Sequence, residues 1–294
     1  YRSLPGTLGD RLRGVLYDED GETYMAIEDG RCPMWRTDGL CRIQAELGEA
    51  ALCRTCREFP RLTHDYGDFI ERGLELSCPE AARIILSSSP EPWITEEIPG
   101  GEEPEYDEEA MAVLKATRTR ALELLSDESR SIPQTLAAFL LYGCQAQSQL
   151  DGDEEVPFDP EDALDSVRQF LQPGSLEEIL QVYRGLEILK PQWRARLESQ
   201  VQLRWQEGVR PLARYFVERY WLQAVSDYDL YSRVKFIVLS CLLVKALGGN
   251  FLRTAQLFSK EIENDADNID ALLDGAYSHS AFTDDKVLGM LLEG

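Results

Sequence analysis

The stretch FIVLSCLLVKALGG, residues 236–249, is the longest strongly apolar run in the chain. A membrane-spanning helix needs roughly 18 consecutive apolar residues, and this run is shorter and is interrupted by Lys245. A helix that is apolar on all sides is normally buried in a protein core. We therefore predict that residues 236–249 form a buried helix of a soluble domain.

The sequence around this run has the same helical character from residue 107 almost to the end. Apolar residues recur at intervals of three and four, which is the pattern of amphipathic helices. The predicted helical runs are 107–126, 131–150, 175–189, 191–206, 211–225, 230–247, 251–263 and 268–278. The sequence therefore predicts a mainly α protein with more than half of its residues in helix and no sheet of more than three strands.

The N-terminal part has shorter elements and more turn signals. A helix is expected over residues 7–17, a strand over 22–27, a hairpin arm over 67–77 and a helix over 78–88 with Pro79 at its first position. We predict a small Cys-rich loop and short-strand region, residues 1–88, packed on an all-helical domain, residues 110–294. Residues 89–109, rich in Pro, Gly and Glu, are expected to form an acidic linker or lid.

The chain is strongly acidic, with 30 Lys and Arg against 53 Asp and Glu and a net charge of −23. Such a field repels phosphate backbones, so nucleic acid is excluded as a partner, whereas a cationic substrate such as a protein lysine is tolerated. No membrane partner is expected either. The chain starts at Tyr1 and carries no visible signal peptide, and we expect a cytoplasmic protein.

Seven cysteines are present, and five of them lie between residues 32 and 78. Cys144 and Cys241 stand alone in apolar helical patterns and are expected to be small buried side chains. The other five have the spacing Cys32-x8-Cys41-x11-Cys53-x2-Cys56-x21-Cys78. A small loop-rich region gains stability from a metal or from cross-links. The spacing alone leaves three interpretations open: a metal or iron–sulfur site, disulfides, or a cluster of buried thiols.

Other residues give weaker signals. His64 follows the cysteines and is either a ligand, a base or a polar turn residue, while His279 is expected at the surface or as a helix cap. The aromatic residues of RYFVERYWLQAVSDYDLY, 214–231, have helical spacing and are expected in the core. No glycine-rich GxGxxG follows a predicted strand, so the doubly wound methyltransferase domain is not supported.

The cysteine block resembles the flagellin lysine-N-methylase family. The resemblance lies in CPMWRTDGLCRIQAELGEAALCRTCREFPR, residues 32–61, in ERGLELSCPEAARIIL, residues 71–86, and in FSKEIENDADNIDALLD, residues 258–274. The positions that match the family pattern are Cys32, Cys41, Cys56, Pro60, Arg61, Cys78, Pro79 and Glu80. Cys53 is not a usual cysteine of this family.

The resemblance implies methyl transfer from S-adenosylmethionine to the ε-amino groups of lysines on flagellin, the subunit of the bacterial flagellum. It also implies a [4Fe–4S] cluster on Cys32, Cys41, Cys56 and Cys78, with zinc as the alternative metal. A cluster held by only three cysteines leaves one iron open, and the resemblance implies that such an iron would chelate the amino-carboxylate end of the methyl donor.

Family members also carry a Cys-Cys pair before a Gly-Trp, which these residues lack, so the resemblance implies an incomplete ligand set here. The alternative function is a non-catalytic protein-binding module with a structural zinc or iron site.

Overall fold

The computed structural model describes residues 1–28, 30–87, 105–201, 203, 205 and 208–293. It divides the chain into two compact units, an N-terminal unit, Tyr1–Phe59, and a helical unit, Pro60–Gly294. The protein is 62% helical, and its described sheets are two antiparallel hairpins of two strands each. The prediction of a mainly α protein is confirmed. The expected linker, 89–109, falls largely outside the described residues.

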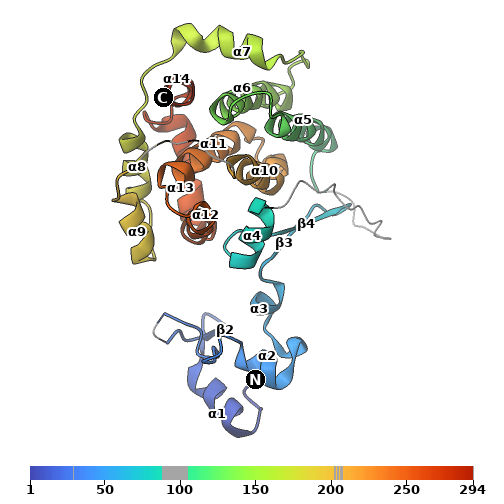
Figure 1. Cartoon of the computed structure of the whole chain (residues 1–294). Helices are drawn as coiled ribbons and strands as arrows, with labels where there is room; N and C mark the ends of the chain where they lie inside the picture. The colour runs from blue at the N-terminus through green and yellow to red at the C-terminus, as the bar shows by residue number, and fades with distance from the viewer. Residues whose placement is uncertain (29, 88–104, 202, 204, 206–207, 294) are drawn as a thin grey trace. The chain divides into compact units, whose positions relative to one another are not determined.

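Helix α11 (Leu230–Ala246) contains most of the apolar run and lies at the centre of the helical unit (Figure 1). Every residue of α11 except Tyr231 is buried, which confirms the predicted buried helix. Its buried Lys235 donates a hydrogen bond to the Tyr231 hydroxyl and forms an ion pair of 2.8 Å with Asp284. These partners offset the cost of burying an ammonium group.

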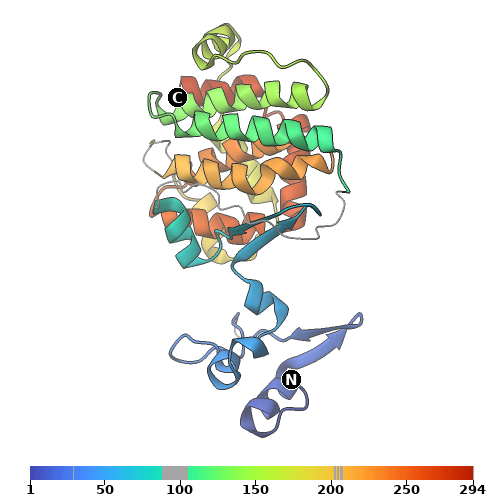
Figure 2. The same cartoon turned by 90° about the vertical axis from the view of Figure 1, so that its right-hand side faces the viewer.

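The neighbouring helices cover α11 in a layered bundle. Figure 2 shows α5, α6 and α10 running side by side across the helical unit. Helices α6, α10, α12 and α13 contact α11 directly. The bounds are α5 (Glu108–Ser126), α6 (Ile132–Leu150), α7 (Pro160–Val167), α8 (Leu176–Gly185), α9 (Pro191–Leu197), α10 (Val209–Tyr220), α12 (Phe251–Phe258), α13 (Ala266–Ser278) and α14 (Asp284–Leu292).

Two predicted helices are clearly shorter in the structure than in our expectation. The run 175–189 was expected to be helical to its end, but α8 ends at Gly185. The run 191–206 was expected to be helical throughout, but α9 ends at Leu197. Val201, Leu203 and Trp205 beyond it are not helical and pack against the core.

The first part of the helical unit is a hairpin followed by a helix. Strands β3 (Arg61–Asp65) and β4 (Ile70–Leu74) pair antiparallel, and α4 (Pro79–Ser87) packs against α10 and α12. Pro79 is the first residue of α4, as predicted. The hairpin and α4 belong to the helical unit, which begins at Pro60. The domain bounds expected from the sequence stay a prediction.

The N-terminal unit has a small core of its own. Helix α1 (Gly6–Val15) contributes Leu8, Leu12 and Val15, which pack with Met34 and Ile43. The other elements are β1 (Leu16–Glu19), β2 (Glu22–Met25), α2 (Arg42–Leu47), η1 (Glu49–Ala51) and α3 (Arg54–Glu58). This small number of buried side chains is what we expect of a loop-rich region, because such a region has little apolar surface to bury.

None of the helices in the described part of the chain has the length and apolar character to cross a membrane. Helix α11 is buried within the helical bundle.

Helices α6 and α11 approach closely where α6 has a glycine. A Cβ atom on Gly143 would lie 2.3 Å from Cγ1 of Val234, which is far inside van der Waals contact. We predict that Gly143→Leu destabilises the protein by about 1–3 kcal/mol, as overpacking of a core does. Urea unfolding measures the change. Gly185→Ala is the matched control, because a Cβ at Gly185 meets nothing within 4 Å. Equal effects of the two substitutions would contradict this packing.

Candidate functional site

The cysteines of the N-terminal unit lie near one another. The Cys56 thiol makes a hydrogen bond with Cys53 and is within electrostatic reach of Cys32 and Cys41. Two of these residues begin helices, since Cys41 is the N-cap of α2 and Cys53 is the N-cap of α3. Local helix starts therefore bring together residues that are up to 24 positions apart in the sequence.

The electrostatics of this group disfavour a thiolate when no cation is present. Burial, the hydrogen bond that the protonated Cys56 thiol makes with Cys53 and the charges of neighbouring cysteines raise the pKa of Cys56 to about 11. A bound metal cation would act in the opposite direction, because a coordinated thiol loses its proton. The thiols of the N-terminal unit are therefore suited to binding a metal cation.

The predicted metal ligands are divided between the two units. Cys32, Cys41 and Cys56 belong to the N-terminal unit, and Cys78 belongs to the helical unit. Across the described ranges, no three His, Cys, Asp or Glu side chains are assembled as a metal site, and all seven cysteines are free thiols. Thiolates are the donors that zinc and iron–sulfur clusters prefer, so the residue types fit such a group. The four-cysteine ligand set stays a prediction.

Sequence reasoning missed two neighbours of Cys56. It set Cys53 aside, although Cys53 is the direct hydrogen-bonding partner of Cys56. It also passed over Tyr1, whose hydroxyl donates to the Ala51 carbonyl and lies within electrostatic reach of Cys53, Cys56 and Cys41. The CxxC spacing was a signal for Cys53. No local signal marked Tyr1.

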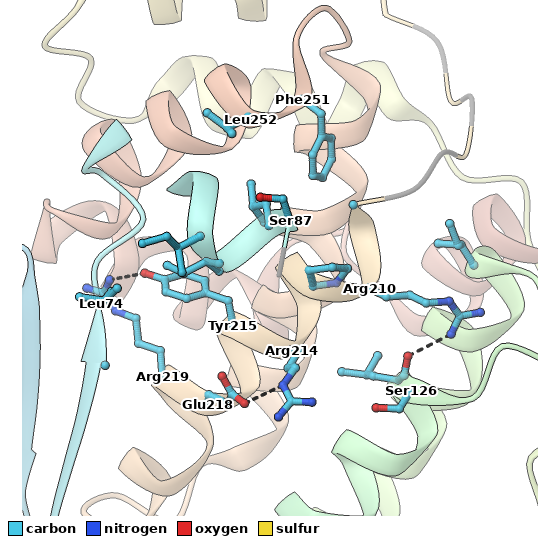
Figure 3. Close-up of a pocket in the computed structure, with 18 of the residues that line it drawn as sticks. Leu74, Ser87, Ser126, Arg210, Arg214, Tyr215, Glu218, Arg219, Phe251 and Leu252 are labelled. Carbon is cyan, nitrogen blue, oxygen red and sulfur yellow. Dashed lines mark hydrogen bonds and ion pairs between the residues drawn. The ribbon is translucent and has the colours of Figure 1, made fainter. Parts of the chain in front are cut away.

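The helical unit contains a pocket of about 1360 Å³, which we call the α10 pocket (Figure 3). It is bounded by the β3–β4 hairpin, the last turn of α4, the end of α5, one face of α10 and the start of α12. Leu62, Leu74, Ile132 and Phe251 are among its apolar lining residues. Several arginines also line it, which is unusual for a chain of net charge −23.

One face of α10 supplies a polar stripe to this pocket. Arg210, Arg214 and Glu218 are spaced four residues apart, so they lie on the same face of the helix. Arg210 donates to the carbonyl oxygens of Leu125 and Asp127 at 3.0 and 2.8 Å. Arg214 donates through Nε to Glu218 at 2.8 Å. Figure 3 shows Arg210 reaching from α10 toward Ser126 at the end of α5, while Arg214 lies beside Glu218.

A buried network holds the adjoining wall of the pocket. Glu263 accepts hydrogen bonds from the hydroxyls of Tyr215 at 3.1 Å and Tyr220 at 3.0 Å, and it pairs with Arg219 at 3.1 Å. Glu263 belongs to a single π-helical turn, η4 (Ser259–Glu263), and its side chain is fully buried. The aromatic run was predicted to be core, and this is confirmed for Tyr215, Phe216, Tyr220 and Trp221, whereas Tyr228 is exposed.

His64 lies on β3 and lines the α10 pocket rather than occupying a turn. Its Nε2 atom is buried and has no hydrogen-bond partner among the described residues. Burial and the nearby charge of Arg219 lower the pKa of His64, although Glu71 acts in the opposite direction. His64 is therefore a neutral imidazole near pH 7. His279 is the C-cap of α13, in agreement with the expectation of a cap.

Comparison with known proteins links a part of the chain to lysine methylation. The chain is 42% identical over 67 residues to a flagellar biosynthetic protein, FliU, of Salmonella muenchen, a match that covers 23% of this chain and 40% of FliU. It is also 42% identical over 67 residues to lysine-N-methylases of Salmonella typhimurium strain LT2 and Salmonella choleraesuis strain SC-B67. Those two matches cover 23% of this chain and 17% of each relative.

The chain thus spans less than half the length of the curated relatives that it matches. No protein-family model and no solved structure matches it. A part of the chain is therefore similar to proteins named for lysine N-methylation and for flagellar biosynthesis. The matches support a relation to the flagellin lysine-N-methylase family that the cysteine block resembles.

If the thiols of the N-terminal unit hold a metal, Cys56→Ser should remove most of the metal that the anaerobically prepared chain binds. The reason is that Cys56 is within reach of the other three thiols of its unit. Elemental analysis gives the metal content per chain. Cys241→Ala is the control, because Cys241 is fully buried in α11. This control should keep the metal and lose on the order of 1 kcal/mol of stability. Equal metal loss in both variants would contradict a special role for these thiols.

The environment of His64 predicts a pH dependence of stability. An imidazole whose pKa is lowered by folding binds fewer protons than it does in the unfolded chain, so its protonation destabilises the folded state. Its contribution is complete above the unfolded pKa of about 6.5 and is lost as the pH falls through the lowered pKa.

His64→Gln should therefore lose less stability than the wild type between about pH 7.5 and about pH 5, as measured by urea midpoints. His279→Gln, which removes the other histidine, should behave as the wild type does. A larger acid loss in His64→Gln than in the wild type would refute this assignment.

Proposed function

We propose that this chain is the core of a protein lysine N-methyltransferase that moves a methyl group from S-adenosylmethionine to lysine ε-amino groups of flagellin. The observation that carries the proposal is the 42% identity over 67 residues to proteins named lysine-N-methylase. The acidic surface supports it, because a net charge of −23 favours the approach of a cationic lysine side chain.

The reaction places two requirements on the protein. A lysine ammonium has no lone pair, so it must first lose a proton; its nitrogen then attacks the methyl carbon, and the carbon–sulfur bond breaks with its electron pair on sulfur. The protein must also hold donor and acceptor together while excluding water. A partly enclosed pocket serves both needs, since desolvation lowers the pKa of an amine.

The thiols of the N-terminal unit form the second part of the proposal. Cys32, Cys41 and Cys56, with Cys78 from the helical unit, would hold an iron–sulfur cluster in the full-length protein. With all four thiols bound, every iron of a [4Fe–4S] cluster would have a protein ligand; a Lewis-acidic iron would be supplied only if three of the four cysteines held the cluster. The electrostatic coupling of the three thiols in one unit supports their part in such a site.

The proposal predicts that full-length protein, prepared anaerobically, transfers methyl groups from S-adenosylmethionine to flagellin lysines. Mass spectrometry of flagellin after incubation detects each added methyl group. Cys41→Ser and Cys56→Ser should abolish the transfer, and Cys241→Ala should leave it at the wild-type level.

Two results would overturn this function. Metal-loaded full-length protein that methylates no flagellin would favour a binding module instead, as would a colourless protein with a single zinc. Transfer that survives both cysteine substitutions would remove the cluster from the mechanism while leaving the methyltransferase.

A further inference from the structure

We infer that the α10 pocket binds a small zwitterionic molecule, with its carboxylate at Arg210 and Arg214 and its cationic centre at Glu218. The inference rests on the proposed function for one point only, the identity of that molecule as the methyl donor. S-adenosylmethionine carries a carboxylate at one end and a sulfonium cation in the middle, which is this class of ligand.

The guanidinium groups of Arg210 and Arg214, in the first half of α10, still have N–H donors for an anion. Arg214 uses Nε on Glu218, and its two Nη groups have no partner within residues 60–87, 105–201 and 208–293. Arg210 is anchored on backbone carbonyls rather than on carboxylates, so its charge is not neutralised by a hydrogen-bonded acid. Burial lowers the pKa of Arg210, while the nearby charges of Glu128 and Asp127 act in the opposite direction, and an anionic ligand would add to their effect. A carboxylate suits such donors because guanidinium groups bind it in a planar, bidentate manner.

The start of α10 adds to this preference. The N-terminus of a helix carries a partial positive charge and backbone N–H groups that point outward. Arg210 is the second residue of α10 and lies in that first turn. The Arg210 guanidinium itself lies against the carbonyl oxygens of Leu125 and Asp127, so an anion bound to it gains only a longer-range contribution from the N-terminus of α10.

Glu218, at the other end of the stripe, is suited to a cation. It is eight residues after Arg210, which corresponds to about 12 Å along the helix axis. Burial raises the pKa of Glu218 even though Arg214 is hydrogen bonded to it. A cationic centre placed beside Glu218 would stabilise the carboxylate. The stripe thus has opposite electrical character at its two ends.

The rest of the pocket has the size and surface for such a ligand. Small-molecule sites commonly enclose about 300–1,000 Å³, and the α10 pocket has about 1360 Å³. Apolar side chains such as Ile84, Leu74 and Phe251 supply a surface for a nucleobase. The volume leaves room for a second group beside the donor, such as a lysine side chain.

The test measures binding of S-adenosylmethionine to the full chain by isothermal titration calorimetry. Arg214→Gln should weaken binding about tenfold or more, because one charge-assisted contact is lost. Arg120→Gln is the matched control, since Arg120 is exposed on α5, pairs with Glu123 and does not line the pocket. It should bind as the wild type does.

A charge-exchange variant distinguishes a direct loss of S-adenosylmethionine binding from a loss caused by unfolding. The double variant Arg214→Glu with Glu218→Arg keeps an ion pair on α10 but reverses the stripe. It should retain the helical circular dichroism of the wild type and lose S-adenosylmethionine binding to the same extent as Arg214→Gln.

S-adenosylhomocysteine, which lacks the sulfonium charge, tests the cationic end. The wild type should prefer S-adenosylmethionine over S-adenosylhomocysteine, and Glu218→Gln should reduce that preference. Unchanged binding of S-adenosylmethionine in Arg214→Gln and in the charge exchange would overturn the inference. A lysine-containing flagellin peptide that loses binding in these variants, while the donor does not, would also overturn it.

Different results would refute the proposed function and the proposed ligand of the α10 pocket. If the donor binds in the pocket but no flagellin is methylated, the proposed function is wrong and the ligand class stands. If flagellin is methylated with an unchanged donor affinity in Arg214→Gln, the function stands and the donor lies elsewhere.

Discussion

Helix α11 is buried along nearly its whole length, and the rest of the helical unit is arranged to cover it. Burial of each large apolar side chain contributes roughly 1.5–3 kcal/mol, so a helix of this kind cannot remain exposed. Helices α6, α10, α12 and α13 supply the cover. Gly143 allows α6 to approach Val234 closely, and the buried Lys235 is tolerated because Asp284 and the Ala276 carbonyl face it.

The burial of α11 by its neighbouring helices also determines where the α10 pocket forms. The apolar face of α10, with Leu212, Phe216 and Val217 buried, is held in the core beside α11. Its opposite face carries Arg210, Arg214 and Glu218, and the β3–β4 hairpin, α4 and α12 surround that face instead of open solvent. Glu263 fixes the neighbouring wall by binding Tyr215, Tyr220 and Arg219. A polar stripe that a simpler bundle would expose to water thus lines a partly enclosed space.

Much of the fold could be predicted from the sequence because it depends on local periodicity. The helical runs from residue 107, Pro79 at the start of α4 and the burial of residues 236–246 all follow from neighbouring residues. The α10 pocket could not be predicted, since Leu62, Ile132, Arg214 and Phe251 meet only through tertiary packing. The end of α9 at Leu197 was missed, and so was the non-helical conformation of Val201 and Trp205, because helical and alternating patterns overlap in short apolar runs. The cysteine group was visible from spacing, but the closeness of Cys53 and Tyr1 to Cys56 depends on how the turns fold.

In our proposals, the thiols of the N-terminal unit contribute to a metal site. The α10 pocket of the helical unit binds the methyl donor. The location of the donor is the central claim. Ultraviolet cross-linking of radiolabelled S-adenosylmethionine to the full chain, followed by peptide mapping, tests it most directly. The account predicts label in peptides that cover residues 208–219 or 125–132. Label confined to residues 1–59 would place the donor at the cysteines and contradict the account.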